Sequence, residues 1–180
     1  MDAEYEGGPS HWSKVDVTDP ASVTTCLDEM EKEFDEPLNA CIQCAGVGHA
    51  FKTITSKGIV HPLVDFERVL RINTSGTFNV ARLAAERMKK TARPPGILRG
   101  CIINTASIAA YEGQCGQVAY SASKGAIVGM TLPMARDLAP LGIRVMTIVR
   151  ELSGNFCLGF MALIFEVEAI GISCSHTFFP

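Results

Sequence analysis

Two residues able to do acid–base chemistry together, Tyr120 and Lys124, stand four positions apart in a stretch with helical periodicity. Side chains at this spacing lie on one face of a helix and can meet. An ammonium group beside a phenol favours the phenolate form, which makes a tyrosine usable as a general acid or base. By itself the pair is equally compatible with an ordinary surface contact, because chance supplies such pairs in some chains of this length.

A serine at a defined position makes a catalytic interpretation of this pair more specific. Ser107 follows the apolar stretch 101–106 and so stands at the carboxyl end of a predicted buried strand, where α/β folds place their sites. Requiring a serine at this one spacing makes a chance match rare. Ser107, Tyr120 and Lys124 therefore form a candidate site, to be positioned by a strand and the helix that follows it.

The elements that must hold these residues alternate along the chain. Short apolar or β-branched runs alternate with longer runs of helical period, which is typical of βα units around a parallel sheet. Strands are predicted at residues 11–17, 39–43, 100–105 and 143–149, and helices at 19–34, 63–90 and 118–139. Thr18 or Asp19 is the expected N-cap of the first helix, and Pro133 predicts a kink or an early end in the third.

The composition is that of a folded globular domain. The 180 residues are 47% hydrophobic and 19% charged, and the formal net charge is -3. Without a positive excess the chain is not expected to bind nucleic acid. The longest apolar run, residues 156–165, is about half of what a membrane span needs, and no targeting segment is visible, so we expect neither a span nor a signal peptide.

Three other motifs have competing interpretations. Ser121 and Lys124 match the Ser-x-x-Lys of penicillin-binding acyl enzymes, but the companion motifs Ser-Asp-Asn and Lys-Thr-Gly are absent from the sequence. Cys41 and Cys44 spell Cys-x-x-Cys, yet residues three apart on a strand face opposite sides, so core cysteines are predicted instead of a metal site or a disulfide. No metal site is expected from the four histidines either, which are predicted on the surface or in loops: His11, His49, His61 and His176.

Taken in order, these motifs resemble the short-chain dehydrogenase/reductase family. The serine, followed thirteen residues later by Tyr-x-x-x-Lys, is similar to the family's catalytic signature. Cys44-Ala45-Gly46 resembles the Asn-Ala-Gly turn after its fourth strand, and Asp16-Val17 resembles the adenine-contacting pair after its third. Asn73 resembles its helix asparagine. The resemblance covers about residues 14–149, including the continuous block 103–148.

The resemblance implies an NAD-dependent oxidoreductase of secondary alcohols and ketones, with NADP left open as the cofactor. Tyr120 would exchange a proton with the substrate, Lys124 would favour the phenolate and hold the nicotinamide ribose, and Ser107 would steady the substrate oxygen. Asn73 would complete a water relay to Lys124. A 3-hydroxyacyl-CoA or a hydroxysteroid is the implied substrate, and a mitochondrial homotetramer the implied setting, a cytoplasmic location being the alternative.

The sequence also departs from the family. The implied fold is a Rossmann-like, doubly wound parallel sheet, but no glycine-rich phosphate-binding turn is visible, so the sheet is predicted to be truncated at both ends. In the family's strand order, the first two strands, which are not visible in this sequence, lie between the strands at 11–17 and 39–43. Without them the strand at 11–17 would have no neighbour, and the strand at 39–43 would become an exposed apolar edge. Residues 1–149 are interpreted as a partial dinucleotide-binding domain and 150–180 as an unrelated apolar tail. An inactive fragment that acts only by binding is the alternative.

Overall fold

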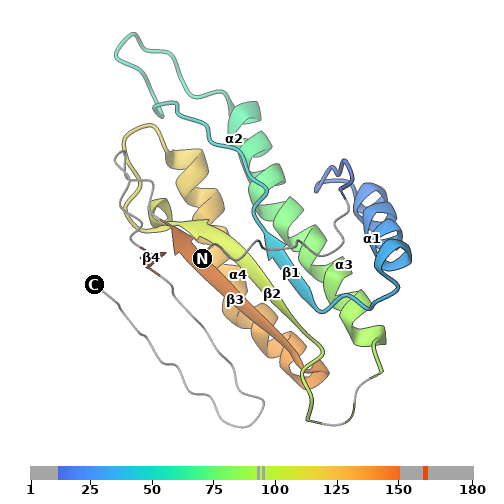
Figure 1. Ribbon diagram of the computed structural model, residues 1–180. Coiled ribbons are helices and arrows are strands. Elements are labelled where there is room, and N and C mark those ends of the chain that lie inside the picture. The colour runs from blue at the N-terminus through green and yellow to red at the C-terminus, as the bar shows by residue number, and fades with distance from the viewer. Residues whose placement is uncertain (1–11, 93, 95, 151–159, 162–180) are drawn as a thin grey trace, which may run out of the picture.

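Four strands form one open sheet in the computed structural model, which describes residues 12–92, 94, 96–150 and 160–161. The strands are β1 (Ala40–Gln43), β2 (Gly100–Ser107), β3 (Ile143–Arg150) and β4 (Phe160–Met161), in spatial order β1-β2-β3-β4. The first three run parallel and β4 is antiparallel to β3 (Figure 1). The predicted α/β class with a parallel sheet is confirmed.

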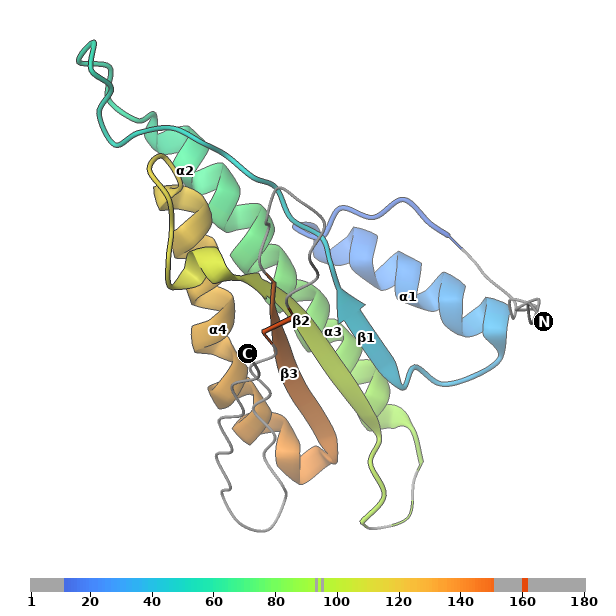
Figure 2. The same cartoon turned by 60° about the vertical axis from the view of Figure 1, so that its left-hand side comes forward.

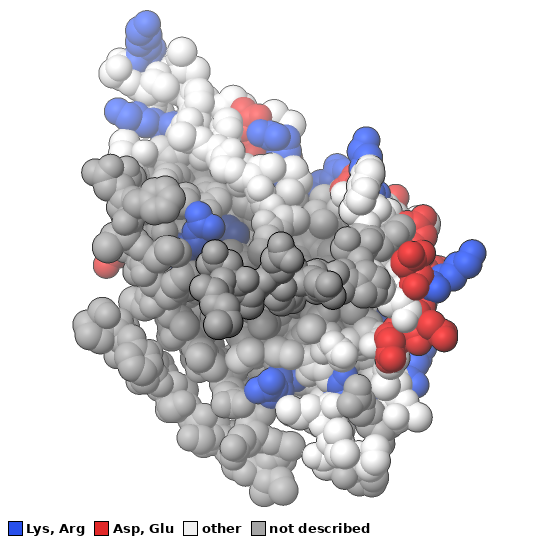
Figure 3. Space-filling model, viewed as in Figure 1, with Lys and Arg blue, Asp and Glu red and all other residues white. Residues whose placement is uncertain are grey.

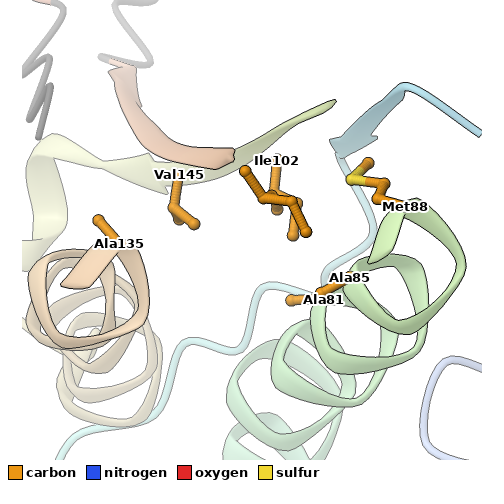
Figure 4. Close-up of a cluster of buried hydrophobic side chains, with 7 residues drawn as sticks. Ala81, Ala85, Met88, Ile102, Ala135 and Val145 are labelled. Carbon is orange, nitrogen blue, oxygen red and sulfur yellow. The ribbon is translucent and has the colours of Figure 1, made fainter. Parts of the chain in front are cut away.

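The core lies between this sheet and two long helices. Helices α3 (Thr77–Lys90) and α4 (Val118–Leu138) cover the same face of β2 and β3 (Figures 2 and 4). Ile102 of β2 and Met88 of α3 are both 0% exposed and meet Val145 of β3 in the central apolar cluster. Ala81, Ala85 and Ala135 present only methyl groups to this cluster, which lets the helices approach the sheet closely.

The predicted helix at 63–90 forms one continuous helical stretch with an irregular middle. It begins as α2 (Leu63–Leu70), widens into the π-helical segment η1 (Arg71–Gly76) and continues as α3. A π-helical turn within an α-helix adds one residue to the turn and is frequent at functional sites. Asn73, predicted from the family resemblance, lies within it.

Helix α1 (Pro20–Phe34) confirms the first predicted helix. The Asp19 carboxylate accepts a hydrogen bond from the backbone N–H of Ala21, as expected for an N-cap. Acidic side chains gather over α1 (Figure 3), and two of them, Asp28 and Glu31, bind Arg87 of α3 at 2.5 and 3.0 Å. These ion pairs join α1 to the body of the molecule.

The predicted strand at 11–17 is wrong for its described part, because residues 12–17 pair with no strand. Their backbone groups bond to side chains instead. The N–H of Asp16 donates to Ser22 Oγ at 2.9 Å, and the carbonyl of Val17 accepts from Asn79 Nδ2 at 2.9 Å. A strand needs a neighbouring strand for its hydrogen bonds, and no described strand pairs with this segment.

Helix α4 does not end early, since it continues through Pro133 to Leu138. Proline removes the amide that would have bonded the carbonyl four residues earlier. That carbonyl belongs to Gly129, which is exposed, so water can satisfy it. Of the two outcomes predicted for Pro133, the early end is wrong, because the freed carbonyl belongs to an exposed residue, and the kink stays a prediction.

The exposed edge predicted for the strand at 39–43 is confirmed. Of the described strands, β1 pairs only with β2, and Ile42 is 66% exposed. Among the described residues, no helix is long and apolar enough to span a membrane. Most of the predicted tail, residues 151–159 and 162–180, lies outside the described part of the chain, as does His11 at the start of the first predicted strand.

Candidate active site

A cavity of about 540 Å³ opens at the carboxyl ends of β2 and β3. Ser107 comes from the end of β2, and Tyr120 and Lys124 come from the first turns of α4. All three line this one cavity, together with residues of the loop after β1, of β2, of the segment before α4 and of the end of β3: Cys44, Gly46, Val47, Gly48, His49, Ala50, Thr105, Ala106, Gln117 and Arg150. The structure thus brings together the three residues that the sequence singled out.

Ser107 is held by the turn that follows it. It is the N-cap of the 3₁₀ turn η2 (Ile108–Ala110), and its Oγ accepts a hydrogen bond from the N–H of Ala109 at 3.2 Å. The side chain is 4% exposed. Because the oxygen already accepts one bond, its orientation is set, and its O–H remains able to donate to an acceptor in the cavity.

Lys124 is a buried ammonium group beside the tyrosine. It is 6% exposed, its Nζ donates to the carbonyl of Thr105 at 2.6 Å, and it lies 5.8 Å from the centre of the Tyr120 ring. Burial lowers the pKa of Lys124, and the neighbouring Cys44 sulfur acts in the opposite direction. The hydrogen bond to the Thr105 carbonyl therefore holds the Lys124 ammonium group next to the half-buried phenol of Tyr120.

Asn73 lies behind the cavity wall. It is 0% exposed and its side chain spans two segments: Oδ1 accepts from the N–H of Val47 at 2.8 Å, and Nδ2 donates to the carbonyl of Val47 at 2.9 Å and to Ser123 Oγ at 3.0 Å. A Cβ atom on Gly46 would stand 3.2 Å from Asn73 Oδ1 and 3.8 Å from Lys124 Nζ. Asn73 therefore shapes the site from beneath the glycine.

The segment 44–46 separates two cavities. Cys44 and Gly46 line the cavity that holds Tyr120, and Cys44 also lines a second one of about 330 Å³, with Ala45 and Val17. The Cys44 sulfur is 3.8 Å from Thr105 Oγ1. The loop after β1 therefore contacts both spaces, as a cofactor-binding turn at the carboxyl end of a strand would.

Asp16 is not brought to the cavity that Ser107, Tyr120 and Lys124 line. It is exposed, and its Oδ1 accepts from the Thr18 N–H at 2.9 Å and the Thr18 hydroxyl at 2.8 Å. These bonds lower the pKa of the Asp16 carboxyl. Val17 packs against η1, where its side chain leaves no room for a Cβ atom on Gly76.

The sequence analysis missed several cavity-lining residues, among them His49, Gln117 and Arg150. His49 follows β1 and lies 3.8 Å, Nε2 to Oδ2, from Asp65, whereas the sequence placed it only in a loop or on the surface. Arg150 ends β3, so the boundary expected after residue 149 obscured it. His49 and Arg150 stand at the carboxyl ends of strands, which is the signal that could have found them, whereas Gln117 precedes α4 and carries no such signal.

The cysteines and histidines give no sign of a metal centre in the part of the chain that the structure describes, where no group of three or more potential ligands converges. Cys41 and Cys44 are free thiols. Cys41 packs against the core cluster, and burial raises the pKa of its thiol to about 11.

Comparison with known proteins gives the same family from sequence and from structure. The short chain dehydrogenase family model matches residues 2–151. The chain is 54% identical over 154 residues to human 3-hydroxyacyl-CoA dehydrogenase type-2, a match covering 85% of this chain and 59% of the relative. The Drosophila melanogaster protein of the same name is 50% identical over 135 residues, covering 74% and 52%.

Two solved structures agree. The crystal structure of 3-hydroxyacyl-CoA dehydrogenase type-2 from Mycobacterium avium matches with a TM-score of 0.72 and 34% identity, over 77% of this chain and 54% of the other. NAD⁺-bound xylitol dehydrogenase matches with a TM-score of 0.67 and 34% identity, over 78% and 50%. The chain spans between half and three fifths of the length of these relatives. With a matching family model, relatives above half identity and a shared fold, the chain belongs to the short-chain dehydrogenase family.

Proposed function

We propose that the chain carries the reaction centre of an NAD-dependent oxidoreductase that interconverts a secondary alcohol and a ketone. One observation carries the proposal: Ser107, Tyr120 and Lys124 line a single cavity, and Lys124 is buried in it against a strand carbonyl. A phenol, an ammonium group and a hydroxyl donor around one space are what proton exchange at a substrate oxygen requires.

Tyr120 is the proposed general acid and base. In the oxidising direction its phenolate oxygen takes the proton of the substrate hydroxyl, and in the reducing direction the phenol returns it to the carbonyl oxygen. Lys124 supports this step because its ammonium group, 5.8 Å from the ring centre, favours the negative charge on the phenolate. Its bond to the Thr105 carbonyl holds it in place.

Ser107 and Asn73 have supporting roles in this proposal. The Ser107 hydroxyl donates to the substrate oxygen and stabilises the charge that develops there. Asn73 holds the loop after β1 in position through its two bonds to Val47. A water molecule between Asn73 and Lys124 would complete a proton path, with Gly46 leaving the room for it.

The cofactor proposed for this site is NAD, with NADP as the alternative, and it supplies hydride transfer at its nicotinamide ring. The nicotinamide end has fitting residues, since Tyr120, Lys124 and Gly46 line one cavity. Cys44 and Ala45 would contact the adjoining ribose and diphosphate, and Asp16 and Val17 the adenine end. The described residues include no glycine-rich turn between a strand and a helix for the diphosphate.

The proposed substrate class is a 3-hydroxyacyl-CoA, with a hydroxysteroid as the alternative. Its support is the name of the relatives that are 50 to 54% identical. A mitochondrial location, with a cytoplasmic one as the alternative, and a homotetrameric assembly are proposed on the same resemblance. Fractionation of cells and light scattering of the purified chain test these two points separately.

An inactive chain that keeps the fold is the competing proposal, and a specific observation favours it. Among the described residues, β1 pairs on one side only, beside an apolar cavity of about 330 Å³ lined by Val17, Ala45 and neighbours. In the dinucleotide-binding strand order 3-2-1-4-5-6, the strand with the diphosphate turn would lie on that side of β1. A chain lacking a diphosphate turn there would hold its reaction centre without holding the cofactor.

A titration of NADH into the purified 180-residue chain separates the two proposals. Fluorescence reports binding, and a melting curve reports stabilisation, because a ligand that binds only the folded state raises the melting temperature. Saturable binding with a higher melting temperature supports the oxidoreductase. A cooperative melt unchanged by NADH supports the inactive chain, and the same titration with NADPH decides the cofactor preference.

A further inference from the structure

Ser123, between the two proposed catalytic residues of α4, connects them to the π-helical segment. It is 0% exposed and does not line the cavity. Its Oγ accepts a hydrogen bond from Asn73 Nδ2 at 3.0 Å and donates one to the carbonyl of Tyr120 at 2.7 Å. The backbone carbonyl of Ser123 accepts a third bond, from Thr74 Oγ1 at 3.3 Å.

The direction of this chain of hydrogen bonds is fixed by Val47. Its N–H can only donate and its carbonyl can only accept, so they determine which end of the Asn73 amide is oxygen and which is nitrogen. The second N–H of the amide then points at Ser123 Oγ. A serine that accepts there has its own O–H free to donate, and it does so to Tyr120.

Only a side chain that accepts and donates at once completes this arrangement. An alanine at position 123 would leave one N–H of the buried Asn73 amide without an acceptor. The amide would then turn to recover a partner, and its two bonds to Val47 would weaken with it. The helical turn that holds Tyr120 and Lys124 would lose its link to η1 through the hydroxyl.

We propose that Ser123 is a positioning residue, whose hydroxyl holds the turn of α4 bearing Tyr120 and Lys124 in register with Asn73 and the loop after β1. It acts through its neighbours and touches neither substrate nor cofactor. Its effect on turnover rests on the proposed oxidoreductase function. Its effect on the arrangement of Asn73 does not.

The neighbouring serine provides a matched control. Ser121 lies on the same helical turn, and its Oγ is buried without a hydrogen-bond partner among the described residues. Ser121→Ala therefore removes the same atoms two residues away without breaking a bond. Ser123→Thr is the conservative variant, because it keeps a hydroxyl able to accept and donate.

The first measurement is hydrogen exchange at the amide of Val47, followed by NMR in the full chain. Its N–H is bonded to Asn73 Oδ1, so its protection reports the orientation of that amide. Ser123→Ala is expected to speed this exchange about tenfold or more, and Ser121→Ala to leave it unchanged. If Ser123→Ala does not fold, Ser123→Cys replaces it, since a thiol fills the space and bonds weakly.

The second measurement is turnover with NAD. Ser123→Ala is expected to lower kcat about tenfold to a hundredfold, as small misplacements of reacting groups do, with KM for NAD changed less than twofold. The pH at which kcat reaches half its maximum is expected to move upward, because a displaced Lys124 favours the phenolate less. Ser123→Thr is expected to restore most of the rate.

The outcomes separate this proposal from the proposed function. Unchanged Val47 exchange in Ser123→Ala overturns the positioning role, whether or not the chain turns over substrate. Faster exchange with unaltered kcat and pH profile also overturns it and leaves a purely structural contact. If the wild-type chain shows no turnover, the oxidoreductase proposal fails, and Val47 exchange alone decides whether Ser123 orders the site.

Discussion

The neighbouring strands β1 and β2 position different parts of the proposed site. They differ in the number of strands with which each one pairs. β2 pairs with β1 on one side and with β3 on the other, and its Ile102 and Asn104 are 0% exposed. Within the part of the chain that the structure describes, β1 pairs with β2 alone, and its Ile42 is 66% exposed. A buried side-chain hydrogen bond, in which Gln43 Nε2 donates to Asn104 Oδ1 at 2.9 Å, joins β1 to β2.

The candidate site follows this difference. Ser107 ends β2, and Lys124 bonds to the carbonyl of Thr105 in β2, so the proton-exchange residues depend on the strand with two neighbours. Asp16 and Val17, the proposed adenine contacts, lie beside the edge strand in a segment that pairs with no strand. The proposed proton-exchange centre therefore rests on strand pairing, whereas the proposed adenine end rests on side-chain hydrogen bonds such as Asn79 Nδ2 to the carbonyl of Val17.

The largest effect is expected at the centre itself. Tyr120→Phe removes the proposed acid–base group and is expected to lower kcat by about a hundredfold or more, the usual scale for such a group. Tyr111→Phe is the control, because Tyr111 is 52% exposed and does not line the cavity. Initial rates of NADH formation measure both, and equal rates for the two variants would remove Tyr120 from the mechanism.

Replacing one isoleucine by alanine in each strand compares how much the two side chains contribute to the free energy of unfolding. Ile102→Ala in β2 is expected to lower the free energy of unfolding by about 2–5 kcal/mol, because it empties a buried site. Ile42→Ala in β1 is expected to change it by less than about 0.5 kcal/mol, since most of that side chain is already in water. Urea unfolding measures both, and a large loss from Ile42→Ala would mean that something covers the edge in solution.

A substitution in the loop that follows β1 is expected to have a smaller effect. Gly46→Ala places a Cβ atom 3.2 Å from Asn73 Oδ1 and 3.8 Å from Lys124 Nζ, so a neighbour must shift. A drop in kcat of a few fold to about tenfold is expected, below that of Tyr120→Phe. Gly48→Ala meets nothing within 4 Å and serves as the control. A normal rate for Gly46→Ala would show that the site tolerates movement there.

The smallest effect is expected at Asp16. The Thr18 amide and hydroxyl lower its carboxyl pKa, so the contribution to stability is present above the ordinary pKa of an aspartate and is lost as the pH falls through the lowered value. Because Asp16 is exposed, solvent screens much of it. Melting curves between pH 6 and 2 should fall slightly less steeply for Asp16→Asn than for the wild type, and a steeper fall would contradict this.

Much of this fold followed from pattern alone. Helix α1 begins at the N-cap Asp19, and β2 and β3 are apolar runs with alternate residues buried under the helices, so capping and hydrophobic pattern predicted them. The strand at 11–17 and the end at Pro133 were wrong for one shared reason. Both depended on partners that local sequence does not specify: a neighbouring strand in the first case and solvent at Gly129 in the second.

The sequence by itself determined which groups could do the chemistry, because Tyr120 and Lys124 share a helical face and Ser107 ends a strand, whatever surrounds them. Only the tertiary structure decided that Lys124 is buried against Thr105, that Asn73 reaches Val47 and Ser123 from another helix, and that Asp16 stays outside the cavity. These contacts join residues far apart in the chain. They exist only once the strands have paired and the helices have packed on them.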